Sequence, residues 1–97
     1  MKTIRTESTD RLFEALLCLE SIDECYDFFE DLCTINEIKA MSQRFDVALA
    51  LDNGLNYQEI EQTIDVSSGT ISRIRRAFDY GKGGYGAVIA KLKQKKG

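Results

Sequence analysis

The chain of 97 residues contains no proline and no histidine, and it has only three cysteines. Without proline, no helix is interrupted by a missing backbone donor. Without histidine, both the commonest general base and a mixed Cys/His zinc site are missing. Cys18, Cys25 and Cys33 form no Cys-x-x-Cys pair, so we interpret them as buried free thiols in a reducing compartment. We therefore expect no enzyme, no metal site and no required cofactor.

Long apolar runs are also missing. No run approaches the roughly 18 apolar residues of a membrane span, and residues 1–10 lack the apolar stretch of a signal peptide. We therefore expect a cytoplasmic protein without a membrane partner. With 43% hydrophobic and 30% charged residues, the composition is that of an ordinary folded chain. Residues 1–97 should form one domain with a modest core, which association with a second copy would supplement.

Charge is distributed unevenly along the chain. Residues 1–55 carry 5 basic and 12 acidic side chains, a net −7, whereas residues 56–97 carry 8 basic and 4 acidic ones, a net +4. An acidic body with a basic end is typical of a protein that binds a polyanion such as DNA. An ordinary basic tail is the alternative, because four lysines after residue 90 supply half of the positive charges of the second part.

Apolar residues recur with a helical period, and no segment of four or more residues alternates as a strand would. Helix starts are indicated where Ser21, Thr34 and Asn56 each precede a glutamate by three residues, as in a capping box. Asn53-Gly54 is typical of a helix end. The sequence therefore predicts an all-α fold whose helices cover residues 12–19, 22–33, 35–52, 57–64, 69–80 and 87–93. A flexible glycine hinge is predicted at residues 81–86.

The segment from Tyr57 to Arg76 has the pattern of a helix-turn-helix. Two short helices are separated by the four residues 65–68. One face of each helix is apolar at positions that allow the pair to pack together at a steep angle. The inward-facing residues are predicted to be Ile60, Ile64, Val66, Ile71, Ile74 and Phe78.

The outer face of the second helix carries small hydroxyl residues followed by arginines. Small residues let a helix approach the major groove of DNA closely, and arginines bind guanine edges or phosphates. The predicted DNA-binding residues are Gln58, Ser67, Ser68, Gly69, Thr70, Ser72, Arg73, Arg75 and Arg76.

Two acidic residues depart from the usual pattern of such motifs. Glu61 stands where a small residue is preferred, and its carboxylate would repel phosphate. Asp65 stands where glycine is preferred, although aspartate tolerates the left-handed conformation. Together with the net charge of −3, they motivate an alternative: a helical protein-interaction module that has lost operator binding.

Several strings resemble the Trp repressor family, and more closely its YerC/YecD-type branch. They are Thr34-Ile35-Asn36-Glu37, Thr70-Ile71-Ser72-Arg73 and the glycine-rich residues 79–86. The resemblance implies a six-helix, Trp-repressor-like fold in an intertwined homodimer. Residues 8–55 would supply the dimerisation helices, residues 56–80 the helix-turn-helix, and residues 81–97 the glycine hinge and C-terminal helix. It also implies a bacterial transcription regulator, in the first place a repressor, that presents two recognition helices to double-stranded DNA.

The resemblance further implies an effector pocket. Thr34, Arg44 and Arg73 match the positions at which the family's namesake binds tryptophan. However, Ile74 replaces a glycine of that pocket and Ala77 a serine, and a branched side chain would fill the space that an indole needs. We therefore expect any small-molecule corepressor to be a compound other than tryptophan.

Overall fold

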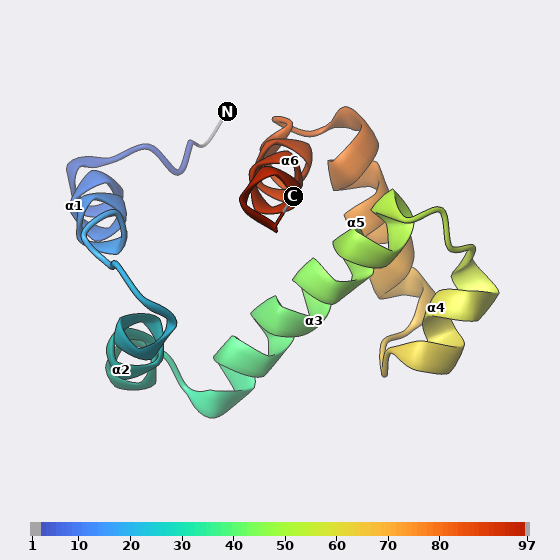
Figure 1. The fold of residues 1–97 in the computed structure, drawn as a ribbon, viewed down its shortest axis with the longest axis horizontal. Coiled ribbons are helices and arrows are strands. Elements are labelled where there is room, and N and C mark those ends of the chain that lie inside the picture. The colour runs from blue at the N-terminus through green and yellow to red at the C-terminus, as the bar shows by residue number, and fades with distance from the viewer. Residues whose placement is uncertain (1–2, 97) are drawn as a thin grey trace. The chain divides into compact units, whose positions relative to one another are not determined.

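The computed structural model describes residues 3–96, and in that part of the chain it contains six α-helices and no strand (Figure 1). This confirms the predicted six-helix, all-α class; Met1, Lys2 and Gly97 of the predicted domain 1–97 lie outside the described residues. The chain divides into two compact units at Ile35/Asn36. The helices are α1 Glu7–Leu16, α2 Ile22–Leu32, α3 Ile35–Asp52, α4 Tyr57–Thr63, α5 Ser68–Tyr80 and α6 Gly84–Lys96.

Helix ends lie where capping residues predict them. The Asn56 side chain accepts the Glu59 amide at 2.9 Å, and the Glu59 carboxylate accepts the Asn56 amide at 2.9 Å, which completes a capping box. The Ser21 side chain caps α2 by accepting the Glu24 amide, but the Glu24 carboxylate accepts the amide of Glu20 instead of that of Ser21, so this box is not reciprocal. After α3, Gly54 has a φ of 84°, and the Leu55 amide donates to the carbonyl of Ala50. This pair of features is typical of a Schellman end.

Three helix starts differ from the prediction, and that of α5 differs by a single residue. α1 begins at Glu7 because Thr6, rather than a later residue, is its N-cap and accepts the Thr9 amide. α6 begins at Gly84, inside the predicted hinge, so that only residues 81–83 separate it from α5. A Cβ at Gly81 would lie 2.4 Å from the Ala77 carbonyl oxygen, and the chain can make this close turn only with glycine.

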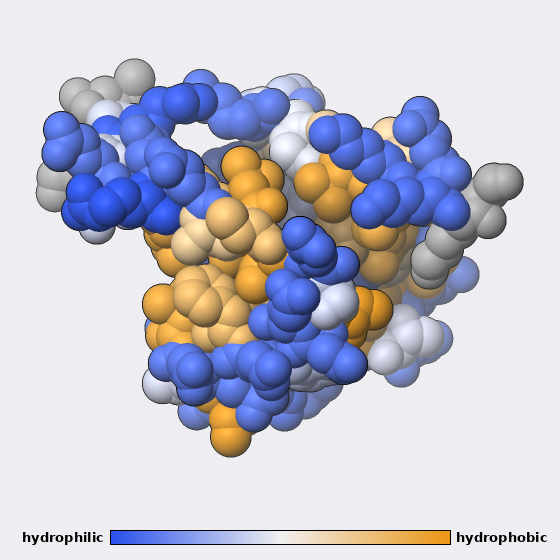
Figure 2. Space-filling view, turned by 60° about the vertical axis from the view of Figure 1, so that its left-hand side comes forward, coloured by the Kyte–Doolittle hydropathy of each residue, from blue (hydrophilic) through white to orange (hydrophobic). Residues whose placement is uncertain are grey.

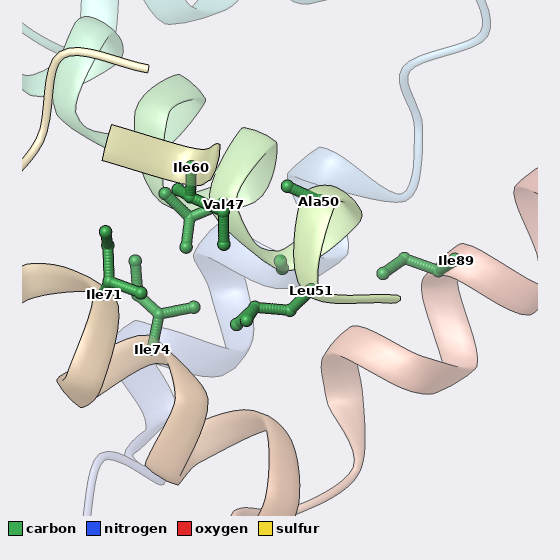
Figure 3. Close-up of a cluster of buried hydrophobic side chains, with 8 residues drawn as sticks. Val47, Ala50, Leu51, Ile60, Ile71, Ile74 and Ile89 are labelled. Carbon is green, nitrogen blue, oxygen red and sulfur yellow. The ribbon is translucent and has the colours of Figure 1, made fainter. Parts of the chain in front are cut away.

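The core lies in the second unit and is built around the C-terminal half of α3. Side chains from α4, α5 and α6 converge on it, as Figure 3 shows for Ile60, Ile71 and Ile89. Ile64, Val66 and Phe78 pack against its edge, so the predicted inward face of the α4–α5 pair is confirmed. Tyr85 of α6 stacks between Phe45 and Phe78, with ring centroids 6.5 and 6.3 Å away. The buried residues are Val47, Ala48, Ala50, Leu51, Ile60, Ile71, Ile74 and Ile89.

Ile71 gives a graded test of this core, because its side chain is fully buried. Ile71→Ala should lower the free energy of unfolding by about 3 kcal/mol, and Ile71→Val by about 1 kcal/mol, since the larger deletion leaves the larger cavity. Urea unfolding followed by circular dichroism measures both values. Equal, negligible losses for the two variants would contradict the assigned position of Ile71.

The first unit contains no core of its own. None of the residues 3–35 is buried, and Leu17, Ile22 and Tyr26 are exposed. Figure 2, in which the left-hand side of Figure 1 comes forward, shows apolar side chains at the surface of the molecule.

The prediction that the cysteines are buried is wrong for the protomer: Cys18 and Cys25 are exposed and Cys33 is half-buried. The reason is that, within residues 3–35, α1 and α2 do not bury each other's apolar faces. Among residues 3–96 no helix is long and apolar enough to cross a bilayer.

Candidate nucleic-acid interface

α4 and α5 are joined by a tight turn of four residues, 64–67. The Val66 amide donates to the Ile64 carbonyl at 2.8 Å, which closes a three-residue turn around Asp65. None of the described non-glycine residues has a positive φ, so Asp65 does not adopt the left-handed conformation that its glycine-preferring position suggested. The turn is instead held by this short hydrogen bond and by Val66, which packs against the core.

The N-terminal end of α5 presents hydroxyl groups. Ser67 is the N-cap: its Oγ accepts the Thr70 amide at 3.2 Å and lies 3.1 Å from the Thr70 Oγ1. α5 begins at Ser68 rather than after it, and both Ser68 and Gly69 are exposed. The first amides of a helix have no intrahelical acceptor, and they carry the positive end of the helix dipole. This end of α5 can therefore donate hydrogen bonds to a phosphate.

The arginines of α5 are exposed but not equivalent. Arg73 and Arg76 lie on the same face as Ser72, while Arg75 donates through Nε to the Asp79 carboxylate at 2.8 Å. An exposed i,i+4 pair of this kind is weak, so it does not remove Arg75 from a DNA surface. The Asp79 carboxylate does offset the positive charge of Arg75, so Arg73 and Arg76 remain the stronger candidates for contacts with DNA.

The remaining predicted residue, Gln58, is exposed near the start of α4. The two acidic residues that depart from the motif, Glu61 and Asp65, are exposed as well. All nine predicted DNA-binding residues thus lie on α4, on the turn or on α5, and all are exposed except Thr70, which is half-buried. Their contact with DNA stays a prediction.

A pocket of about 320 Å³ lies between α3, the turn and α5. Arg44 and Arg73 both line it, so the structure brings together two of the three predicted effector residues. Thr34 precedes α3 and is not one of the lining residues. Ile74 forms part of the wall and is buried, with 4% of its side chain exposed. Ala77, the other position that differs from the namesake, lines a separate apolar groove with Phe45, Tyr85 and Val88.

Gln43 is a residue of this region that the sequence pattern did not single out. It lies on α3 beside Arg44, lines the pocket, and donates through Nε2 to the Asp65 carbonyl of the turn at 3.4 Å. Its position next to Arg44 was the only signal in the sequence, because a hydrogen bond between residues 22 positions apart does not follow from helical spacing.

Among residues 3–96, no group of three or more Cys, Asp or Glu side chains is arranged to hold a metal ion.

Known proteins are similar to this chain in sequence and in the arrangement of their helices. YerC of Bacillus subtilis (strain 168) is 42% identical over 91 residues, which cover 94% of this chain and 88% of YerC. The crystal structure of a TrpR-like protein from Eubacterium eligens ATCC 27750 is 46% identical, covers 93% of both chains and has a TM-score of 0.89. A structure described as a candidate Trp repressor from Staphylococcus aureus is 42% identical, with the same TM-score and coverage of 93% and 90%.

The family model of the Trp repressor protein matches residues 7–93, which include all six helices except the last turn of α6. The described fold, the relatives and the family model therefore agree on one family of DNA-binding regulators, which are not enzymes. This chain belongs to the Trp repressor family, in its YerC-type branch.

Proposed function

We propose that the protein is a sequence-specific transcription regulator, in the first place a repressor, that binds double-stranded DNA through α5. The single observation that supports this most is the two-sided character of α5. Ile71 and Ile74 fix one side in the core, and Ser72, Arg73 and Arg76 are exposed on the other. As in a helix-turn-helix, α4 and the turn would hold α5 at the angle needed to enter a major groove. Because its target would be DNA, we place the protein in the cytoplasm. We assign no catalytic role to any residue.

The proposal includes a homodimer. α1 and α2 have 10 and 11 residues, and isolated helices of this length are marginal in water. They become stable only when their apolar faces are covered, and none of the described residues 3–35 of the first unit is buried. A second copy, intertwined through residues 8–55, would cover these faces. It would also place two α5 helices about 34 Å apart, one turn of DNA.

A titration of DNA binding against salt tests the proposal. Between 50 and 200 mM salt, affinity for duplex DNA should fall by about 1,000-fold if the dimer makes some six phosphate contacts. Fluorescence anisotropy with a labelled duplex measures this directly. Absence of binding by the dimer at low salt would refute the proposal, and stable co-purification with a protein partner would then favour the interaction module.

We also propose that the pocket between α3, the turn and α5 is an effector site for a small molecule other than tryptophan. Arg44 and Arg73 suit a carboxylate, but Ile74 occupies the wall where an indole would lie. Thr34 remains part of the proposed site only if it reaches the pocket in the dimer.

Added L-tryptophan should therefore leave both the unfolding temperature and the DNA affinity unchanged. A ligand at 100 times its dissociation constant would stabilise the folded state by about 2.7 kcal/mol, which a thermal shift assay detects easily. A panel of the other amino acids, measured in the same way, serves as the comparison. A clear upward shift with tryptophan alone would overturn this part of the proposal.

A further inference from the structure

Gln43 connects α3 to the turn that precedes α5. Its half-buried side chain reaches the Asp65 carbonyl, and the Nε2 to oxygen distance is 3.4 Å. That distance is longer than the 2.7–3.2 Å of most N–H···O bonds. Loss of this bond should therefore loosen the turn without unfolding the domain.

The turn determines where the N-terminal end of α5 lies. Asp65 is the centre of the short turn closed by Val66, and Ser67, the next residue, is the N-cap of α5. A shift of the Asp65 carbonyl would therefore move Ser68 and Gly69, the first residues of the helix. In contrast, Ile71 and Ile74 hold the following turn of α5 in the core. The end of α5 that would enter DNA thus depends on the turn more than on the core.

Side chains of α3, the turn and α5 also meet around the pocket. Ile74 forms part of its wall, and its side chain points from α5 toward the core, as Figure 3 shows beside Ile71. Val66 packs against the core from the turn, and Gln43 adds the polar link. Gln43 therefore supplies a polar contact between α3 and the turn, beside the apolar contact of Val66.

We propose that Gln43 is a positioning residue for DNA binding: its bond to Asp65 holds the turn and the N-terminal end of α5 in place. This inference rests on the proposed function and adds a residue on α3, outside the helix-turn-helix, that supports it.

Gln43→Met tests the inference in the full-length protein. Methionine has nearly the same length and no charge, but it cannot donate the hydrogen bond. Hydrogen exchange at the Val66 amide, which donates to the Ile64 carbonyl, should become faster. DNA affinity should fall by about 3- to 10-fold, the range of one neutral hydrogen bond. Hydrogen–deuterium exchange with mass spectrometry and anisotropy titration give the two values.

Two control variants separate positioning from other effects. Gln94→Met makes the same chemical change at an exposed site on α6, and Ile89→Val removes one buried methylene group from the core outside the turn. Both should leave turn exchange and DNA affinity unchanged, although Ile89→Val lowers stability by about 1 kcal/mol.

Unchanged exchange at the turn in Gln43→Met would overturn the inference, and so would wild-type DNA affinity despite faster exchange. Failure of the wild-type protein to bind DNA would refute the proposed function instead. Turn exchange in Gln43→Met would then still decide whether Gln43 holds the turn.

Discussion

Ile22→Asp is expected to abolish the dimer and to lower the unfolding temperature by more than about 10 °C. Ile22 is 74% exposed in the protomer, and substitutions at such positions usually change stability by no more than about 0.5 kcal/mol. If a second copy covers the residue, the substitution buries an unpaired carboxylate and costs about 3 kcal/mol or more. For a chain of this size, that corresponds to a fall of at least about 12 °C.

The position of Ile22 makes this test specific for burial. It is the first residue of α2, where an aspartate is favourable for the helix itself because of the helix dipole. A loss of stability would therefore report on a covered face and not on helix propensity. Sedimentation velocity gives the oligomeric state, and thermal circular dichroism gives the unfolding temperature.

Asp23→Asn is the matched control for this variant. Asp23 is the neighbouring residue, one of two acidic residues in the first turn of α2, and it is exposed. It should leave both dimer and unfolding temperature unchanged. An Ile22→Asp protein that remained a stable dimer would contradict the proposal that a second copy covers α2.

Arg73→Ala is expected to weaken specific DNA binding by about 10- to 100-fold, the effect of losing one good arginine contact to a base or to closely held phosphates. Because Arg73 is exposed and is not one of the core residues, the unfolding temperature should not change. Anisotropy titrations on one duplex at one salt concentration measure the loss.

Arg75→Ala is the matched comparison on the same helix. Both substitutions remove one positive charge, but the Arg75 guanidinium already donates to Asp79. Its loss should therefore weaken binding by less than about 5-fold. Equal effects of the two variants would indicate a general charge effect and would remove the special role of Arg73.

Local signals in the sequence predicted the region of α4 and α5 well. The capping of α4 by Asn56, and the spacing that places Ile60, Ile71 and Ile74 on the inward faces of their helices, each depend on residues only a few positions apart in the sequence. For the same reason the exposed face of α5 could be assigned from spacing alone. The effector pocket was predicted in part, since Arg44 and Arg73 line it whereas Thr34 does not.

Features that depend on distant segments could not be predicted in this way. Val47, Ala50 and Leu51 lie at i, i+3 and i+4 on one face of α3, and Ala48 is buried beside them because α4, α5 and α6 surround the C-terminal half of the helix. The Gln43–Asp65 bond likewise joins segments that only the fold brings together. Burial of the cysteines was predicted from their apolar neighbours, but the helices of the first unit do not bury them.

Selection of bound duplexes from a random DNA library tests the central claim most directly. A dimer that reads DNA through two α5 helices should enrich a pseudo-palindrome whose half-sites are centred about 10 base pairs apart. The same selection with Arg73→Ala should lose enrichment at specific positions of each half-site. No enriched sequence with the wild-type protein, or a single half-site without symmetry, would contradict a dimeric, sequence-specific regulator.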